Sequence, residues 1–504
     1  MQSRVISRRQ VIGSGLAASV SIMLAACGGG GSSGGGNGGV PAATTGRGGA
    51  TAVTGGGATA ATGGGAMATT GAGATATPTA APAVGSGATK LQYMVWGRPD
   101  GVNWSYLALN RAYPDDAKRY SVQPVIGGSG DVQVAQKLRL MLSAGDNNLP
   151  DIVALNRTEV PEFAAADLLY DMTDLIKPFA DDMVDTAKAL ATFDGKIVAL
   201  PVSLKPKVWY YRQDIFQKAG VDPDKIVTFD DFIAAGKQLH QMVPESYIYN
   251  SKARAGGYAF DNFLTSFAPV SFYDRQAKKF QVATHPGFRA TYDLLAKLQD
   301  PMVSAPVDNF DPDWSKAFAS NMVVSSPINE WMSSFLPLYV PEQKGLWRVH
   351  AWPGVNGTNK GSDAGGQVAV IPKKSKNPKA AFEYLSKIYL TKQGALANIQ
   401  TSSQTPYLKS ARAEVPSLAK PAADPTNANA LPWPPEFFGA DYFNVIFAAQ
   451  DRMTWIDYDP AAAKELSIRD DWTQRYLAKQ ASLDQTITGL QNDLAGQIGD
   501  PWQV

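Results

Sequence analysis

Residues that commonly perform catalysis or bind metals are few in this sequence, or they lie far apart. The chain has 504 residues, with three distant histidines and a single cysteine, Cys27, which excludes an internal disulfide and a close-spaced zinc site. Adjacent acids such as Asp230 and Asp231 could supply the two carboxyl groups of a glycoside hydrolase. Adjacent residues of a helix point in different directions, however, so a solvated helix face explains such pairs better. The sequence therefore predicts no catalytic centre, no metal and no cofactor.

Four polar or aromatic residues come at the ends of predicted strands, where doubly wound α/β proteins bind ligands. Trp96 ends an apolar run and Arg98 follows in a loop, although a core tryptophan and a solvated arginine fit the same pattern. Ser129 lies in a Gly-Gly-Ser-Gly loop before a predicted helix, either as a ligand contact or as a helix cap. Asn156 directly follows another apolar run. These four residues are candidates for a binding site.

Alternating apolar runs and amphipathic segments position these residues. Residues 91–96, 121–126 and 152–155 are short apolar runs that predict strands. Residues 131–143 carry apolar side chains at the spacing of an amphipathic helix. A strand, a helix and a strand in close succession predict a βαβ unit and hence a parallel sheet covered by helices. The fold class indicated is α/β.

The same alternation continues to the C-terminus. Thr228 and Asp231 fit a capping box that opens a helix. The other predicted segments are strands at 197–200, 207–211, 322–325 and 367–371, and helices at 288–298, 378–390 and 468–498, the last as one long helix or two shorter ones.

The first 89 residues do not share this pattern. Arginines precede an apolar stretch at 11–26, which predicts a secretory signal peptide, and Arg8-Arg9 fits a twin-arginine motif or a chance pair in an ordinary export signal. Leu24-Ala25-Ala26-Cys27 is similar to the bacterial lipobox, with Cys27 as the lipidated residue; the alternative is a free cysteine in a discarded signal. Residues 28–89 are rich in Gly, Ala and Thr and predict a disordered tether that is open to O-glycosylation. We therefore expect residues 1–27 to direct export and lipid anchoring to the cell membrane.

Charge and composition limit the partners. The chain has 46 Lys+Arg and 45 Asp+Glu, a net charge of +1, which gives no field to hold a nucleic acid. Its 44% hydrophobic content is sufficient for a sizeable core. The length suggests two or three domains.

A series of short blocks between Leu91 and Ala411 carries a family resemblance. The blocks are Leu142–Gly145 with Leu149–Val153, Leu169–Asp174, Asp194–Val202, Trp209–Phe216 with Ala219-Gly220, Thr228–Phe232, Ala317-Phe318 with Asn329–Trp331, Gly365-Gly366 with Ser375–Pro378, and Gln404–Tyr407. In this order they resemble the extracellular solute-binding proteins of ABC importers, family 1, typified by maltose- and oligosaccharide-binding lipoproteins. Arg212 departs from the pattern, because Asn is usual there.

The resemblance implies a periplasmic-binding-protein-like fold of type II, in which hinge strands join two doubly wound α/β lobes. We expect residues 90–201 and 303–352 to form the N-lobe, and residues 202–302 and 353–504 to form the C-lobe. A small solute, in this family most often a sugar or oligosaccharide, would bind between the lobes and pass to the transmembrane subunits of an ABC permease. The resemblance implies a monomer without enzymatic activity. A secreted carbohydrate-active hydrolase is the alternative, although motifs for a serine nucleophile, a phosphate loop or a calcium loop are missing. A surface lectin or sensor subunit is a further alternative.

The resemblance also implies further ligand-binding residues. Lys205 lies just beyond the expected crossing at Pro201, in a stretch that often faces the cleft in this family. Trp331 matches a block whose tryptophan usually stacks on the ligand. The remaining candidates are aromatic residues and one glycine: Tyr258, Trp352, Gly366, Tyr407, Trp433 and Tyr442. Each aromatic residue could instead belong to the core, because the chain has 20 Phe, 19 Tyr and 11 Trp.

Overall fold

The computed structural model describes residues 87–146, 148–252, 256–355, 366–422, 427 and 430–503, and the side chains of 256–258 are not included. The described residues belong to one compact unit, Gly63–Val504. The predicted signal peptide, the lipobox cysteine Cys27 and nearly all of the predicted tether lie outside the described residues.

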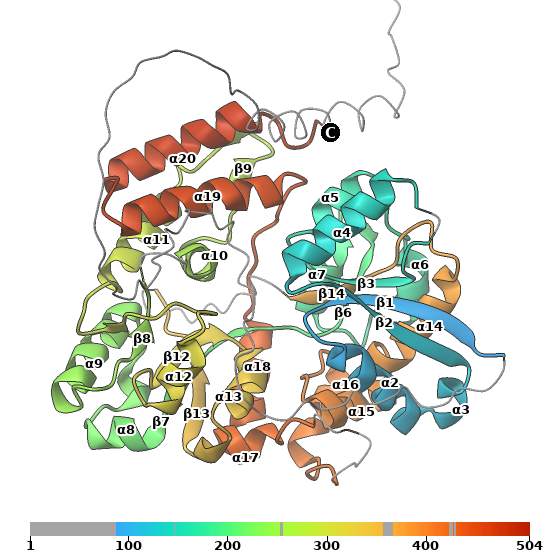
Figure 1. Cartoon of the computed structure of the whole chain (residues 1–504), viewed down its shortest axis with the longest axis horizontal. Coiled ribbons are helices and arrows are strands. Elements are labelled where there is room, and N and C mark those ends of the chain that lie inside the picture. The colour runs from blue at the N-terminus through green and yellow to red at the C-terminus, as the bar shows by residue number, and fades with distance from the viewer. Residues whose placement is uncertain are drawn as a thin grey trace, which may run out of the picture. The chain divides into compact units, whose positions relative to one another are not determined.

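A five-stranded sheet with the order β2-β1-β3-β14-β6 forms the centre of what we call the first lobe (Figure 1). Its strands are β1 (Thr89–Trp96), β2 (Tyr120–Gly128), β3 (Ile152–Asn156), β6 (Ala199–Pro201) and β14 (Gln367–Val370). β1 pairs in parallel with β2 and β3, whereas β14 runs antiparallel to β3 and β6. The predicted parallel βαβ unit is confirmed, and the helix predicted at 131–143 is α4 (Asp131–Ser143).

Helices cover both faces of this sheet because its strands are apolar on both sides. Leu91, Tyr93 and Val95 of β1 pack into one core cluster, and Met94 packs into the cluster on the opposite face. The first cluster includes residues of α2 (Asp100–Ala112), α14 (Pro378–Tyr389) and α15 (Lys392–Ser402). The second includes residues of α4 and α5 (Val160–Ala165). The result is a three-layer α/β lobe, as Figure 1 shows.

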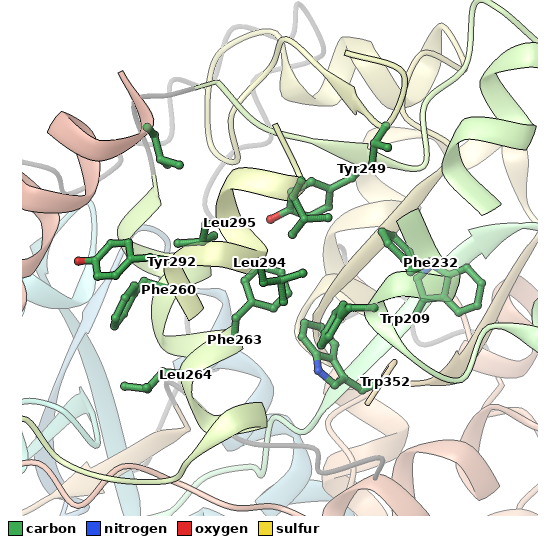
Figure 2. Packing of buried hydrophobic residues seen from close by; sticks show 14 of the residues in the cluster. Trp209, Phe232, Tyr249, Phe260, Phe263, Leu264, Tyr292, Leu294, Leu295 and Trp352 are labelled. Atoms are coloured by element: carbon green, nitrogen blue, oxygen red, sulfur yellow. The ribbon is translucent and has the colours of Figure 1, made fainter. Parts of the chain in front are cut away.

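A three-stranded antiparallel sheet forms the centre of the second lobe. β7 (Lys207–Arg212) lies in the middle, between β12 (Ser325–Asn329) and β13 (Trp347–Ala351). Trp209 and Tyr211 of β7 face a core that includes residues of α9 (Phe229–Met242), α10 (Gly256–Phe267), α11 (Pro286–Lys297), α19 (Ala462–Leu477) and α20 (Leu483–Gln497). Figure 2 shows the dense aromatic packing in this core. Val208 and Tyr210 face a second core formed with α12 (Trp314–Ala319), α13 (Met332–Tyr339), α17 (Pro434–Phe438) and α18 (Tyr442–Asp451).

Shorter elements complete the two lobes. The helices are α3 (Pro114–Ala117), α6 (Thr173–Ile176), α7 (Asp185–Ala191), α8 (Gln213–Lys218) and α16 (Lys409–Arg412), with 3-10 turns at Lys177–Phe179, Pro223–Lys225, Pro341–Gln343 and Val415–Ser417. The short strands are β4 (Thr192–Phe193), β5 (Lys196–Ile197), β8 (Tyr249–Asn250), β9 (Tyr273–Asp274), β10 (Lys279–Phe280) and β11 (Ser304–Ala305).

Strand pairing corrects the expected lobe bounds. The chain leaves the first sheet after β6 and enters the second at β7, but it does not return near Val303. We assigned residues 303–352 to the N-lobe, which corresponds to the first lobe. This range contains β12 and β13, and both strands pair with β7 of the second lobe. β14, which we assigned to the second lobe, pairs with β3 and β6. The apolar runs indicate strands correctly, but pairing partners far apart in sequence leave no local signal.

The structure confirms two local predictions, a helix cap and a helical C-terminal segment, which is divided into two helices. The capping box is present, since the backbone N–H of Asp231 donates to Thr228 Oγ1 (3.1 Å) and that of Thr228 donates to Asp231 Oδ2 (2.8 Å). The C-terminal apolar stripe forms two helices, α19 and α20, because Ser482 begins a second capping box with Gln485. The strand predicted at 322–325 is displaced and begins at Ser325. No helix among the described residues is both long and apolar enough to cross a membrane.

Candidate functional site

One edge of the first sheet gathers several predicted site residues. The parallel strands β1, β2 and β3 end side by side, which brings Trp96, Ser129 and Asn156 to the same edge. The backbone N–H of Gly97 donates to the Gly128 carbonyl (2.8 Å), which joins the first two strand ends. Gly366 directly precedes β14, whose first residue pairs with Asn156. The carboxyl ends of parallel strands are the usual ligand side of such sheets.

A polar cluster surrounds Asn156 at this edge. Its amide Nδ2 donates to Asp131, and its backbone N–H donates to Glu159 Oε2 (2.7 Å). Thr158 Oγ1 donates to the other carboxyl oxygen of Glu159 (2.7 Å). Burial of the Glu159 carboxyl, together with the nearby Asp131 charge, raises its pKa to about 8. Asp131 and Glu159 were not predicted as site residues, although an acid in the first turn of α4 was visible in the sequence.

The other three residues at this edge differ in their surroundings. Trp96 is half-buried and packs partly against both cores of the first lobe. Arg98 is exposed, and its Nε lies 2.7 Å from Asp100 Oδ2. Ser129 is also exposed. Its alternative role as a helix cap is wrong, because Gly130 is the N-cap of α4 and no side chain caps this helix.

The second lobe contains a cavity of about 350 Å³ beside α18. Its floor includes Lys207, the first residue of β7, and Trp352, the residue that follows β13. One face of α18 and its two flanking residues form the wall. The residues of this wall are Asp441, Asn444, Val445, Ala448, Ala449 and Arg452.

Helix α10 holds the floor of this cavity in place. Lys207 Nζ donates to Thr265 Oγ1 (2.7 Å) and to the Asn262 carbonyl. It also lies 4.7 Å from the centroid of the Trp352 ring, within the range of a cation–π interaction. Trp352 Nε1 donates to Ser266 Oγ (3.0 Å), and its ring packs beside Phe263 (Figure 2). Trp352 is therefore a predicted site residue that lines a cavity, but as its buried floor and not as an exposed stacking surface.

Two predicted site residues, Lys205 and Tyr442, converge on Glu330. Lys205 Nζ lies 2.9 Å from Glu330 Oε2, and Tyr442 OH donates to Glu330 Oε1 (3.1 Å). The Glu330 side chain is fully buried. Burial, followed by the Glu330 charge, raises the pKa of the Tyr442 hydroxyl well above its ordinary value. The ion pair therefore connects the segment between β6 and β7 with the end of β12.

The remaining candidates pack within the two lobes. Trp331 is half-buried and stacks on Phe310, with ring centroids 5.6 Å apart. Tyr407 is buried in a first-lobe core, and burial raises the pKa of its hydroxyl. Trp433 is buried beside Phe443 in a second-lobe core. For Tyr407 and Trp433 the core interpretation therefore fits the structure. The side chain of Tyr258 lies outside the described residues.

A larger surface hollow of about 600 Å³ lies between α19 and α20, beside Trp472. A Cβ atom at Gly489 would lie 2.2 Å from the Trp472 ring, so this glycine permits the two helices to pack closely. The Trp472 ring is covered by that contact and by Arg475, whose guanidinium lies 4.8 Å from the ring centroid. The Trp472 ring is thus half-buried where it lines the hollow. The hollow also lies away from the segments that join the two sheets.

These connecting segments link the sheet edge with the cavity. The segment after β6 leads to Lys207, and the segment that begins at Trp352 leads to Gly366 and β14. Lys207 and Trp352 lie next to each other because Val208 pairs with Ala351 in the antiparallel register. Arg157, one residue beyond Asn156, adds a further link: its Nη1 donates to the Ile456 carbonyl (2.6 Å) and its Nη2 to Asp457 Oδ1 (2.8 Å). The candidate site therefore has two parts, one on each lobe, joined by chain segments.

Comparisons with known proteins identify relatives of this chain. The chain is 25% identical over 287 residues to an arabinooligosaccharide-binding protein of Bacillus subtilis, a match that covers 55% of this chain and 63% of that relative. It is 24% identical over 388 residues to a lactose-binding protein of Rhizobium radiobacter, covering 72% of this chain and 83% of that relative. The match thus spans less than two thirds of the Bacillus relative.

A solved structure shares the fold. It is the binding protein of an ABC transporter from B. animalis subsp. lactis Bl-04 in complex with beta-1,6-galactobiose, with a TM-score of 0.67 and 23% identity, covering 81% of this chain and 97% of that chain. This likeness confirms the predicted fold of type II periplasmic-binding-protein-like proteins. Residues 110–429 match the family described as bacterial extracellular solute-binding protein. Because that match covers more than half of the sequence, the chain belongs to the bacterial extracellular solute-binding protein family.

Proposed function

We propose that this protein binds a sugar or oligosaccharide outside the cytoplasm and delivers it to the transmembrane subunits of an ABC permease. The observation that carries the proposal is the convergence of two connecting segments on one cavity. Both segments lead from the ligand-side edge of the first sheet, and they meet at Lys207 and Trp352 in the second lobe. Two lobes joined in this way can close around a ligand by hinge motion.

The chemistry of both parts of the site supports a sugar. Asp131 and Asn156 at the sheet edge, and Asp441 and Asn444 at the cavity, offer carboxyl and amide groups to ligand hydroxyls. The relatives that bind arabinooligosaccharide, lactose and beta-1,6-galactobiose favour the same ligand class. Affinity would come from hydrogen bonds, apolar contact and closure, with no covalent step.

We further propose that the protein works as a monomer held to the membrane by lipid on Cys27. Two acyl chains would give stable attachment, whereas one chain is marginal. A Cys27→Ser variant should appear in the soluble fraction of cells that retain the parent protein in the membrane fraction. Equal membrane retention of both proteins would overturn the anchoring proposal, and the proposal that the protein binds a sugar would be unaffected.

A thermal-shift screen of the full-length protein tests the binding proposal. The panel contains mono- and oligosaccharides, a polyamine, a short peptide and a phosphodiester. A ligand at 100 times its Kd adds about 2.7 kcal/mol to the free energy of unfolding, which is readily seen as a rise in Tm. A rise with sugars alone supports the proposal. A rise with the polyamine, peptide or phosphodiester and with no sugar overturns it.

A further inference from the structure

The residues in the wall of the second-lobe cavity indicate which kind of sugar would bind there. This inference rests on the proposed function and narrows the class of ligand. We propose that the exposed face of α18 selects an acidic oligosaccharide. Arg452 would bind the carboxylate at one end of this ligand, and Asp441 and Asn444 would accept hydrogen bonds from hydroxyl groups at its other end. We call Asp441, Asn444, Ala448 and Arg452 the α18 stripe.

The α18 stripe is long and open along its middle. Asp441 is the N-cap of the helix and Arg452 is its C-cap, so their backbone positions lie about 16 Å apart along the helix axis at 1.5 Å per residue. Positions 441, 444, 448 and 452 are three or four residues apart and therefore share one face. The small side chains of Ala448 and Ala449 leave space between the charged ends. A single sugar ring is too short to reach both ends, which favours an oligosaccharide.

The side chains at the two ends of the stripe make no hydrogen bond and no ion pair within the part of the chain that the structure describes. Asp is a preferred N-cap residue, yet the Asp441 side chain makes no capping hydrogen bond. No ion pair of Asp441 or Arg452 is found among the described residues either. Both side chains are exposed and line the cavity. Their polar atoms are therefore available to a ligand.

Two acids close to Arg452 in the sequence, Asp451 and Asp457, are paired with other arginines. Asp451 accepts both guanidinium nitrogens of Arg412, at 2.7 and 3.0 Å. Asp457 accepts from Arg157 Nη2 at 2.8 Å. Lys207 at the floor is fully buried and is held by α10 and the Trp352 ring, so Arg452 is the exposed cation of the cavity lining. An exposed guanidinium that makes no ion pair among the described residues favours a ligand that carries a carboxylate.

An arginine at this position suits a carboxylate in geometry as well as in charge. Its planar guanidinium forms two parallel hydrogen bonds to the two oxygens of a carboxylate. A uronic acid residue presents such a group on the edge of a sugar ring. Hydroxyl groups, in contrast, are the natural donors to Asp441, which accepts hydrogen bonds only when ionised.

Calorimetric titration of the full-length protein with matched sugar pairs tests this inference. Each pair consists of a neutral trisaccharide and its uronate counterpart of the same linkage, built from glucose, galactose or mannose and from glucuronate, galacturonate or mannuronate. We expect the tightest ligand to be a uronate that binds at least tenfold more strongly than its neutral partner. The advantage should shrink in high salt because this arginine is exposed.

Two variants separate the role of Arg452 from a general effect of charge. Arg452→Gln should weaken binding of the uronate at least tenfold more than binding of its neutral partner, so that the preference within the pair is lost. Arg111→Gln is the matched control, because Arg111 is also exposed but lies on α2, away from the cavity. The control should retain the parent preference.

The outcomes distinguish this inference from the proposed function. Tighter binding of the neutral member, no preference within the pairs, or an unchanged preference in Arg452→Gln would overturn the inference and leave sugar binding intact. Binding of neutral sugars only, with no uronate bound, would do the same. Failure of all sugars to bind, with binding of a different class of solute, would overturn the proposed function itself.

Discussion

Lys207 Nζ lies 4.7 Å from the centroid of the Trp352 ring, although the two residues belong to different segments that connect the lobes. Lys207 begins β7 after the first segment, and Trp352 begins the segment that returns to β14. Both residues are held by α10, through Thr265 and Ser266. A ligand in the adjacent cavity would therefore contact the point where both connections enter the second lobe.

Replacement of Lys207 by methionine should weaken both the fold and ligand binding. The change keeps the length of the side chain but removes a charged donor to Thr265 and the cation–π contact, at a cost of about 2–3 kcal/mol. Urea unfolding and sugar titration measure the two effects. Lys225→Met is the control, because Lys225 is 83% exposed. An unchanged affinity in a folded Lys207→Met protein would show that the cavity floor does not support the ligand.

The Lys205–Glu330 ion pair should behave as a coupled unit. Loss of one partner leaves a buried charge without compensation, which costs about 3–5 kcal/mol. We expect Lys205→Met and Glu330→Gln each to lower the free energy of unfolding, and the double variant to lose less than the sum. Denaturant curves of the four proteins give the coupling energy. Strict additivity would contradict a direct interaction.

The contribution of Glu159 to the free energy of unfolding should fall as the pH rises. Its pKa in the folded protein is about 8, above the ordinary value of 4.5, so the unfolded chain releases this proton first. The contribution of Glu159 to the free energy of unfolding is therefore fully present below pH 4.5 and is lost as the pH rises from about 4.5 to 8. In Glu159→Gln the difference in Tm between pH 5 and pH 8 should shrink.

Glu245→Gln provides the comparison for this pH prediction, because the Glu245 side chain is 64% exposed. It should show the same pH dependence as the parent protein. An identical slope in Glu159→Gln and the parent would mean that Glu159 does not carry the effect.

A methyl group at Gly128 should disturb the sheet edge. A Cβ atom there would lie 2.2 Å from Cβ of Gln133, which is close to the helix backbone and cannot swing away. Gly128→Ala should therefore push the end of β2 away from α4, lower Tm and weaken sugar binding. At Gly101 a Cβ atom meets nothing within 4 Å, so Gly101→Ala in the first turn of α2 should raise stability by no more than about 0.5 kcal/mol. Equal Tm changes in the two variants would contradict this account.

Local patterns account for the elements that the sequence predicted well. The apolar runs of β1, β2 and β3 and the stripe of α4 are properties of short segments, and the structure has them within a few residues of the predicted bounds. Lobe membership is different. β12 and β13 join the second lobe through antiparallel pairs with β7, and no feature of either strand alone indicates that partner.

The candidate site could be predicted only in part, because some of its residues meet through contacts between distant parts of the chain. Trp96, Ser129 and Asn156 meet at one edge because the carboxyl ends of parallel strands coincide, which residue order already implies. Gly366 joins them only because β14 runs antiparallel to β3, a pairing that the sequence did not indicate. The α18 wall consists of polar residues, two alanines and Val445, whose spacing resembles that of any solvated helix. Lys207 becomes relevant only through its contacts with α10 and Trp352, which join distant parts of the chain.

A crystal structure with the tightest-binding sugar tests the two-part site most directly. The account predicts that one sugar molecule contacts the edge of the first sheet near Asn156 and the α18 wall near Asn444 at the same time. A sugar bound to one lobe alone, with either part of the site left untouched, would contradict it.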